Sequence, residues 1–279
     1  MIKEQVNTLI PLSIPHINGK EWEYVKDCLD TGWVSSVGAY VSQFEQVVAE
    51  YAGARYGIAC MNGTAGLHMA MHLHGIGQGD YVIAPNITFI ATLNAIKYTG
   101  ADPILMDINP HNWQMDLDLL AHFLEEQTDL IKGQRVLKSD QRPIKAIMPV
   151  HVLGNMGNMT QLLELAKRYD LIILEDSTEA LGSYFNGQHA GSFGAMGVFS
   201  FNGNKIISTG GGGVMVTDDE ALAKRAKHLT TQAKVSSMEY IHDEIGYNYR
   251  LVNVLAAIGV AQMEQLPDLI HTFLFLDKI

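Results

Sequence analysis

Cysteine is scarce in this sequence: Cys28 and Cys60 are the only two among 279 residues. Two cysteines cannot form the disulfide framework of a secreted protein, so we expect a reducing compartment. Positive charge is also scarce, with 19 Lys and Arg against 30 Asp and Glu, a formal net charge of -11 and no basic cluster. Because nucleic-acid binding needs a Lys/Arg surface that neutralises phosphates, we expect no nucleic-acid partner.

Long hydrophobic runs are absent as well. No apolar stretch approaches the roughly 20 residues that a membrane-spanning helix needs. Residues 1–12 include Lys3 and Glu4 and lack the apolar run of a signal peptide. We therefore expect a cytoplasmic protein with no membrane partner.

The sequence is 47% hydrophobic and contains 26 glycines, which suits an α/β enzyme with a large core and many tight turns. From Tyr56 onward, strand and helix patterns alternate, and predicted strands such as Leu171–Leu174 are continuous apolar runs. Such runs indicate strands covered on both faces. We predict an α/β fold with three layers, a mostly parallel sheet between helices on both faces.

Some stretches depart from this alternation. Residues 128–142 are polar and are predicted to form a surface excursion, and residues 230–244 are predicted to form a loop. A helix is predicted over residues 251–265, ending before Pro267 because proline breaks helices.

A glycine-rich turn, Asn62-Gly63-Thr64-Ala65-Gly66, lies between a predicted strand and a predicted helix. Such a turn presents free backbone N–H groups and the positive end of the helix dipole, which together bind a phosphate. Thr64 is either a phosphate ligand or a helix cap, and capping is the commoner role. The turn matches neither G-x-G-x-x-G nor Walker A, so a dinucleotide site is not indicated.

Two acidic residues, Glu175 and Asp176, follow the apolar strand at residues 171–174. In open α/β sheets ligands bind beyond the carboxyl ends of strands, where a carboxylate can hold a cationic ring nitrogen. The alternative is that Asp176 caps a turn, because Asp-Ser-Thr is typical of turns. Glu179, one turn later, could meet the same ligand.

Lys205 is the only charged residue between Met196 and Thr217. Ser200 precedes it by five positions, and the glycine run at residues 210–213 follows it. An amine in poorly hydrated surroundings loses its proton more readily, as a Schiff-base lysine requires. The alternative is a lysine with a buried stem beside a flexible turn.

Three histidines, His68, His72 and His74, favour a competing interpretation. His68 and His72 are four residues apart on a predicted helix, as in a metal-binding pair. No glutamate completes the H-E-x-x-H pattern, so we expect no metal site.

A phosphate-binding turn, a strand-end aspartate and an isolated lysine, in this chain order, fit one cofactor, pyridoxal 5'-phosphate. The lysine would form the Schiff base, and the aspartate would keep the pyridine nitrogen protonated so that the ring accepts electrons. The glycine run would let the backbone pass close beneath the cofactor.

Several longer stretches carry a resemblance that covers essentially the whole sequence. They are GWVSS at residues 32–36 with FE at 44–45, NGTAGLH at 62–68, PNITFIAT at 85–92, PVHVLG at 149–154, EDSTEALG at 175–182, residues 200–213, and GYNYR at 246–250. In these stretches the sequence resembles the DegT/DnrJ/EryC1/StrS family of sugar-nucleotide aminotransferases, which have the fold-type-I pyridoxal-phosphate fold.

The resemblance implies a role for each matching residue. Lys205 would form the internal aldimine and shuttle the proton, and Asp176 would pair with the pyridine nitrogen. Asn248 would reach the phosphate of the neighbouring subunit's cofactor, which implies a homodimer with a shared active site. The remaining cofactor contacts would be Asn62, Gly63, Thr64, the Ala65 amide and Ser200 around the phosphate, Phe89 against the ring, and Glu179, where many members have Gln or His. The substrate would contact Trp33, Ser35, Ser36 and His151.

The implied reaction is transfer of an amino group from L-glutamate to a nucleotide-linked 4-keto-6-deoxy sugar, in amino-sugar biosynthesis for surface polysaccharides. UDP-linked N-acetyl sugars and GDP-linked perosamine are the candidate products. One alternative is a dehydratase that uses the same cofactor, although those relatives have His in place of Lys205. Another is a truncated, non-catalytic remnant that binds a sugar nucleotide or a partner.

The length of the sequence also bears on its domains. Family members usually continue into a C-terminal small domain, and this sequence ends at Ile279. We therefore expect a cofactor-binding large domain with an N-terminal arm over residues 1–250, and an incomplete small domain over residues 251–279. Cofactor chemistry is expected in this chain, with full turnover impaired.

Overall fold

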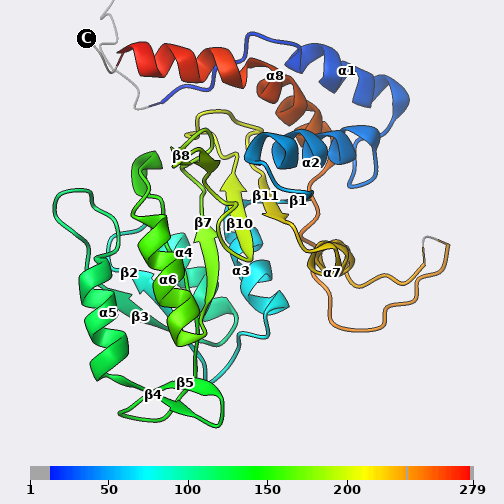
Figure 1. Ribbon diagram of the computed structural model, residues 1–279. Coiled ribbons are helices and arrows are strands. Elements are labelled where there is room, and N and C mark those ends of the chain that lie inside the picture. The colour runs from blue at the N-terminus through cyan, green and yellow to red at the C-terminus, as the bar shows by residue number, and fades with distance from the viewer. Residues whose placement is uncertain (1–12, 237, 277–279) are drawn as a thin grey trace, which may run out of the picture.

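A seven-stranded sheet runs through the computed structural model, which describes residues 13–236 and 238–276 (Figure 1). The strand order is β1-β11-β10-β7-β6-β2-β3. Neighbouring strands from β10 to β3 are parallel, whereas β11 is antiparallel to both β1 and β10. The predicted mostly parallel sheet is therefore confirmed. The strands are β1 Tyr56–Cys60, β2 Tyr81–Pro85, β3 Asp102–Met106, β6 Ile144–Ile147, β7 Ile172–Asp176, β10 Met196–Ser200 and β11 Gly213–Thr217.

Helices cover both faces of this sheet, as the continuous apolar strands predict. On one face α3, α4 and α7 pack with strand residues such as Ile58, Val198 and Met215. On the other face α5 and α6 pack with Ile83 and its neighbours, and α2 and α8 lie over β1, β10 and β11. The helices are α1 Glu21–Thr31, α2 Ala39–Ala52, α3 Gly63–Leu73, α4 Ile90–Tyr98, α5 Leu117–Glu126, α6 Met159–Tyr169, α7 Glu220–Thr230 and α8 Asn253–Leu276.

Several helices begin where the sequence offers a capping side chain. Asn62, Asp116 and Asp219 accept hydrogen bonds from first-turn backbone amides at the starts of α3, α5 and α7. Each cap satisfies donors that would otherwise lack a partner within the helix. Because Asn62 comes two residues after β1, its cap fixes the point at which the chain leaves the sheet edge.

The polar stretch at residues 128–142 contains a hairpin that the sequence pattern did not predict. Strand β4 (Thr128–Ile131) pairs antiparallel with β5 (Gln134–Leu137). Lys132 and Gly133 form its two-residue turn with φ angles of 51° and 78°. Positive φ at both turn residues matches the right-handed twist of a hairpin. A second short hairpin, β8 (Tyr184–Phe185) with β9 (Gln188–His189), lies beside the site.

The prediction that a helix ends before Pro267 is wrong. Helix α8 runs from Asn253 to Leu276 with Pro267 inside it. Leu266 is fully buried, and Leu269 and Ile270 pack against the same apolar cluster, so packing on both sides of the proline offsets the lost hydrogen bond. Helix α8 also packs along α1 and α2 (Figure 1).

A search of the helices in the described part of the chain finds none with the length and apolar character needed to cross a membrane.

Gly197 in β10 lies where two backbones meet, and replacing it should destabilise the fold. A Cβ atom at this position would lie 2.2 Å from the carbonyl oxygen of Gly191, and backbone cannot move aside as a side chain can. We expect Gly197→Ala to lower the free energy of unfolding by about 3 kcal/mol or more, at the upper end of overpacking effects. Urea unfolding measures this value. Gly77→Ala, where the nearest atom is 3.7 Å away, is the control, and equal losses in both variants would contradict the prediction.

Candidate active site

The turn between β1 and α3 forms the first wall of the site. Within the described chain, the amides of Gly63 and Thr64 donate to no other group, as expected in the first turn of a helix. A Cβ atom on Gly63 would lie 3.0 Å from Cγ2 of Thr178 and 3.1 Å from Cβ of Ser200. The turn therefore meets residues that follow β7 and end β10, which are three strands and two strands from β1 in the sheet.

The predicted ligand set of this turn is refined by the structure. The amide of Ala65 donates to Oδ1 of Asn62 at 2.8 Å, so Asn62 acts as the cap of α3. The donors that remain for a phosphate are the amides of Gly63 and Thr64, with the hydroxyl groups of Thr64 and Ser200 nearby.

Within the glycine run, Gly213 lies close to the backbone of the β1–α3 turn, and the predicted passage of the run beneath the cofactor stays a prediction. A Cβ atom there would lie 2.7 Å from the backbone carbonyl carbon of Asn62. Gly210, in contrast, has open space around it and a φ of 80°, a left-handed conformation that glycine adopts without strain. Gly213 thus lets β11 lie close to the β1–α3 turn, and Gly210 forms a tight bend before β11.

Asp176, the last residue of β7, is 3% exposed and held by two donors. The Thr92 hydroxyl donates to its Oδ2 at 2.7 Å, and the Thr178 amide to its Oδ1 at 3.2 Å. Thr92 lies on α4, and its Oγ1 is 2.7 Å from that of Thr88. Thr88 precedes the helix, and the sequence reasoning missed Thr92 as a partner of Asp176. These contacts fix the direction in which the carboxylate faces.

Lys205 is isolated in sequence but not in space. Its Nζ lies 3.2 Å from Oε1 of Glu179, whose Oε2 accepts the Leu153 amide at 2.9 Å. Burial works against a charge on Glu179, but the Leu153 amide and the Lys205 charge outweigh it, and the pKa of Glu179 is lowered from its usual value. The predicted proximity of Glu179 to the site is therefore observed, with its carboxylate against the predicted Schiff-base lysine.

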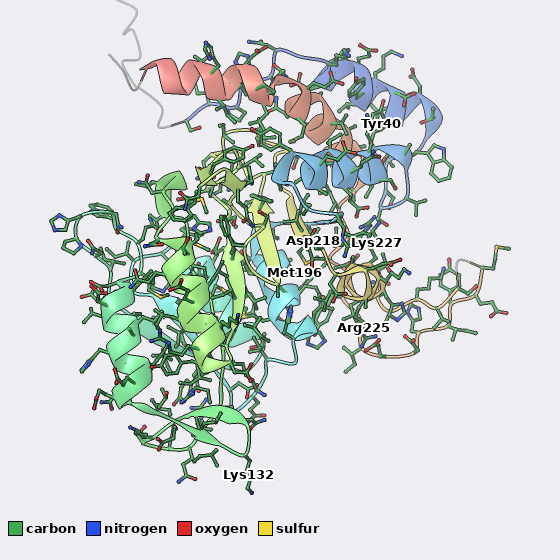
Figure 2. All side chains as sticks on the ribbon, in the orientation of Figure 1. Tyr40, Lys132, Met196, Asp218, Arg225 and Lys227 are labelled. Atoms are coloured by element: carbon green, nitrogen blue, oxygen red, sulfur yellow. The ribbon has the colours of Figure 1, made fainter. Side chains whose placement is uncertain are left out.

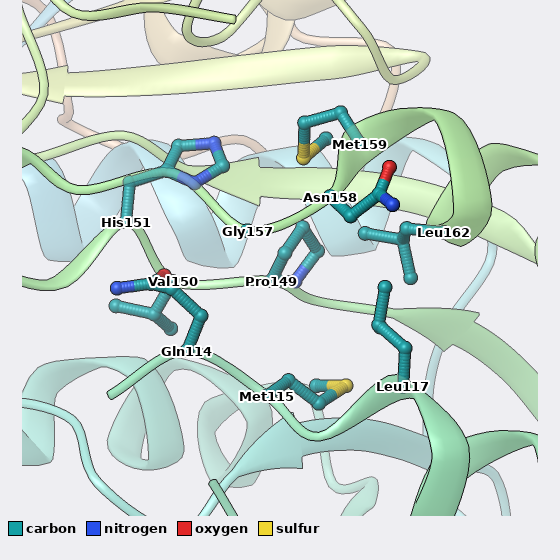
Figure 3. A pocket seen from close by; sticks show the side chains of 10 residues that line it. All are labelled: Gln114, Met115, Leu117, Pro149, Val150, His151, Gly157, Asn158, Met159 and Leu162. Carbon is teal, nitrogen blue, oxygen red and sulfur yellow. The ribbon is translucent and has the colours of Figure 1, made fainter. Parts of the chain in front are cut away.

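Glu175 and His151 lie beneath the site. Glu175 is fully buried and accepts the amides of Gly191, Phe193 and Gly194 as well as Nε2 of His151 at 3.0 Å. His151 is 1% exposed, and its Nδ1 has no hydrogen-bond partner among the described residues. It borders a cavity of about 20 Å³ between α6 and the strand ends (Figure 3), which is enough for one water molecule. The predicted contact of His151 with substrate stays a prediction.

Phe89 and Asn248 lie on the surface of the described chain. Phe89 is 76% exposed and immediately precedes α4, three residues before Thr92. Asn248 is exposed in the segment that follows α7. An exposed aromatic ring beside the aspartate is free to pack on a planar ligand, whereas Asn248 faces outward from its own subunit.

The predicted substrate loop, residues 33–36, joins α1 to α2 and is tied to α8. The Asn253 side chain donates to the Trp33 carbonyl at 2.7 Å, and the Asn253 amide donates to the Ser35 carbonyl at 2.6 Å. Asn253 is 2% exposed, and the sequence reasoning missed it. The Trp33 ring is 56% exposed, and Ser35 is exposed with Ser36 half-buried. Among the residues that the structure describes, no hydrogen bond or ion pair joins this loop to Lys205, so its role in substrate binding stays a prediction.

The geometry suits pyridoxal phosphate. Free amides at a helix start suit a phosphate, a buried carboxylate at a strand end suits a protonated ring nitrogen, and an amine stands between them and Glu179. Gly63 leaves room between Thr178 and Ser200 that a side chain would fill. Fold and site together define the class of pyridoxal-phosphate proteins built on a mostly parallel sheet.

The chain belongs to the DegT/DnrJ/EryC1/StrS aminotransferase family, whose model matches residues 15–272. It is 44% identical over 261 residues to a GDP-perosamine synthase of Escherichia coli O157:H7, covering 94% of this chain and 67% of that protein. It is 40% identical over 259 residues to a GDP-perosamine synthase of Caulobacter vibrioides, covering 93% and 66%. The family and class of enzyme expected from the sequence are confirmed.

Solved structures agree with the fold. A protein described as a sugar aminotransferase, Spr1654 of Streptococcus pneumoniae in its PLP form, superposes with a TM-score of 0.81 at 27% identity. The match covers 93% of this chain and 67% of that one. The chain thus spans about two thirds of the length of the proteins that it matches.

Removing the Thr92 hydroxyl should weaken the hold on Asp176. Thr92→Val keeps the side-chain shape but leaves Oδ2 of this buried carboxylate without its donor. We expect the free energy of unfolding to fall by about 1–3 kcal/mol, as when a buried acceptor loses its partner. Thr31→Val, which removes an exposed hydroxyl bonded to the backbone, is the control. Unchanged stability in Thr92→Val would contradict the predicted hold.

The Glu179 contact should make stability depend on pH in a defined direction. Because the pKa of Glu179 is lower in the folded chain, its charge stabilises the fold above the unfolded pKa of about 4.3, and this stabilisation is lost as pH falls through the folded value. We expect the difference in unfolding free energy between the native chain and Glu179→Gln to be largest near pH 7 and to shrink below about pH 4. Urea titrations at both pH values measure it. A difference that stays constant or grows on acidification would contradict the assignment.

Proposed function

We propose that this chain binds pyridoxal 5'-phosphate and transfers an amino group from L-glutamate to a nucleotide-linked 4-keto-6-deoxy sugar. One observation carries the proposal: residues 62–64, 176–179 and 200–205 meet at one sheet edge, with Lys205 Nζ 3.2 Å from Glu179. The relatives named GDP-perosamine synthase support a GDP-linked sugar as the acceptor. A UDP-linked N-acetyl sugar remains the second candidate.

Bound pyridoxal phosphate would supply an aldehyde that condenses with amines and a ring that accepts electrons. The amides of Gly63 and Thr64 and the Ser200 hydroxyl would hold its phosphate, and Asp176, oriented by Thr92, would hold its ring nitrogen in the protonated form. Lys205 is the amine that can attach covalently to the aldehyde and, once released, move a proton at the reacting carbon. Glu179 would position the Lys205 amine.

A lysine at this position favours transamination over the dehydratase alternative. The proposed large domain covers residues 1–250, and residues 251–279 would begin the small domain. Soluble biosynthesis of a surface-polysaccharide precursor in the cytoplasm is the setting that this reaction implies.

We further propose that two copies of the chain share their active sites. The segment between α7 and α8 projects from the rest of the chain (Figure 1). It carries exposed apolar side chains, with Met238, Tyr240 and Ile245 at 87%, 88% and 83% exposure. Large apolar side chains gathered on one projecting segment are typical of an interaction surface. A second copy covering this segment would bring the outward-facing Asn248 to the partner's cofactor phosphate.

The covalent attachment of the cofactor tests the proposal directly. We expect the chain mixed with pyridoxal phosphate to show an absorbance band that borohydride removes, leaving the cofactor fixed on Lys205 in a peptide map. Lys205→Ala should remove this adduct. Lys132→Ala, in the β4–β5 turn far from the site in Figure 2, is the control and should keep it.

The amino donor and acceptor are tested on the same sample. L-glutamate should shift the absorbance to that of the aminated cofactor, and a GDP-linked 4-keto-6-deoxy sugar should reverse the shift more effectively than a UDP-linked one. A folded chain that never forms the Lys205 adduct would overturn the proposal. An adduct that glutamate leaves unchanged would instead identify a cofactor-binding protein without transaminase activity.

A further inference from the structure

The segment Tyr247–Arg250 is an extended strip bonded along both of its edges. On one edge Tyr247 N donates to the Leu229 carbonyl at 2.7 Å, and Tyr249 N donates to the Thr230 carbonyl at 3.1 Å. On the other edge the Met61 amide donates to the Tyr249 carbonyl at 2.8 Å, and Arg250 bridges Cys60 at the end of β1. Tyr247 and Tyr249 lie on one side of the strip, with ring centroids 5.1 Å apart and both rings against His68, whereas Asn248 between them is exposed.

The tyrosine face is held by α3 through His68. Its Nδ1 lies 3.1 Å from the Tyr249 hydroxyl, and its ring centroid lies 5.2 Å from that of Tyr247. Burial lowers the pKa of His68, and the neighbouring His72 lowers it further. The neutral ring can therefore accept a hydrogen bond from the Tyr249 hydroxyl. His68 and His72, which the sequence presented as a metal pair, therefore face aromatic rings in the described structure.

The opposite face is held by α2 through Glu45, which is 3% exposed. Its Oε1 accepts Arg250 Nη1 and the Ala59 amide, the latter at 2.9 Å. Its Oε2 lies 2.9 Å from Lys227 Nζ on α7 as an ion pair, and among the described residues this oxygen accepts no hydrogen bond. A buried carboxylate with two cations and an amide around it is fixed in place, because losing any of these partners would leave a buried charge poorly compensated.

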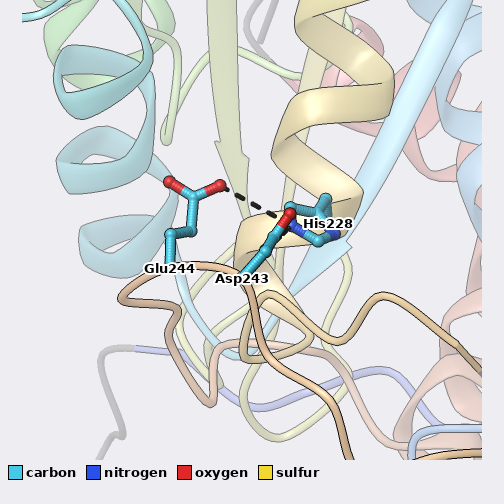
Figure 4. Close-up of side chains that lie close together, drawn as sticks. All are labelled: His228, Asp243 and Glu244. Carbon is cyan, nitrogen blue, oxygen red and sulfur yellow. Dashed lines mark hydrogen bonds and ion pairs between the residues drawn. The ribbon is translucent and has the colours of Figure 1, made fainter.

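A further clasp holds the chain just before this strip. His228 Nε2 lies 2.7 Å from Asp243 Oδ1 (Figure 4). Arg225 Nη2 donates to Glu244 Oε2 at 2.6 Å. Arg225 occupies the Glu244 carboxylate, so this cluster serves as a clasp between α7 and the segment rather than as a metal site. This clasp holds residues before the strip, whereas the contacts of the strip itself set the direction of the Asn248 side chain.

We propose that Glu45 and His68 are positioning residues that hold the strip from its two faces and so present Asn248 to the partner subunit's cofactor phosphate. The inference rests on the proposed shared site. It assigns a role to the Phe44-Glu45 and Asn62–His68 stretches beyond the phosphate turn. Neither side chain needs to touch the cofactor of either subunit.

Single substitutions should first weaken cofactor binding. In Glu45→Gln and His68→Phe homodimers, we expect the dissociation constant of pyridoxal phosphate to rise about tenfold or more, as when a hydrogen bond to a charged group is lost. Tyr249→Phe removes only the hydroxyl that is hydrogen-bonded to His68. The dissociation constant of pyridoxal phosphate should also rise in this variant, which provides a test even if Glu45→Gln folds poorly. Glu50→Gln on α2 and His122→Phe on α5, both exposed, are the matched controls.

Mixed dimers separate positioning across the interface from a general structural defect. One protomer carries Glu45→Gln or His68→Phe, and its differently tagged partner carries Lys205→Ala. The only site that can fix the cofactor with borohydride is then in the first protomer, and it receives Asn248 from a partner with native Glu45 and His68. We expect this site to bind pyridoxal phosphate with native affinity. Affinity that stays low would show that Glu45 and His68 act within their own protomer and would overturn the inference.

An Asn248→Ala protomer paired with Lys205→Ala is the reference mixture. Suppose the Asn248→Ala mixture regains native affinity for pyridoxal phosphate, whereas the Glu45→Gln and His68→Phe mixtures keep low affinity. This result would overturn the inference and leave the shared site supported. Failure of the Asn248→Ala mixture, in a sample shown to be dimeric, would reject the shared site and with it the inference. Native homodimers that form no Lys205 adduct would instead reject the proposed function.

Discussion

Glu175 carries a carboxylate that is closed off from solvent, and four donors converge on it: the amides of Gly191, Phe193 and Gly194, and the His151 ring. A buried carboxylate is tolerated only when its oxygens are satisfied, so the loop before β10 must follow one path. That path fixes the register of β10 on β7, and hence the place of Ser200. Because neighbours on a strand face opposite ways, the residue that fixes this loop also turns Asp176 toward the site.

Much of the fold could be predicted from local pattern. Continuous apolar runs located the central strands, and the glycines located the turn after Cys60, although its cap is Asn62 and not Thr64. The pattern failed where tertiary contacts override local preference. Proline lacks the backbone N–H that a helix needs, so Pro267 predicts a helix end. Helix α8 nevertheless continues past Pro267, because residues on both sides of it pack in one apolar cluster. The hairpin at residues 128–137 has two short strands in which only Thr128 and Val136 are buried, so it lacks the alternation by which a strand is recognised.

The candidate site was predictable as a set of residues but not as a set of contacts. Lys205 had no charged neighbour within reach along the chain, yet Glu179, 26 positions earlier, lies beside it. Thr92 and Asp176 are 84 positions apart, and Glu45 and Arg250 are 205 apart. Pairs at such separations are created by the topology of the sheet, and a single sequence contains no local signal for them. Motif likeness named the residues proposed to meet the cofactor, whereas the contacts that Thr92 and Glu45 make emerged only from the structure.

The insertion of β11 between β1 and β10 has a consequence for how the protein matures. The phosphate turn follows β1, its facing hydroxyl ends β10, and Gly213 of β11 is pressed against the backbone of Asn62. These parts of the site therefore do not come together from residues that are close in sequence. They meet only after β11, which is synthesised late, inserts antiparallel between β1 and β10. Contacts this distant form slowly, because the closure of long loops comes before any reward from pairing. The proposed phosphate site is therefore complete only in a chain whose sheet is complete, and a nascent chain that ends before β11 lacks one of its walls.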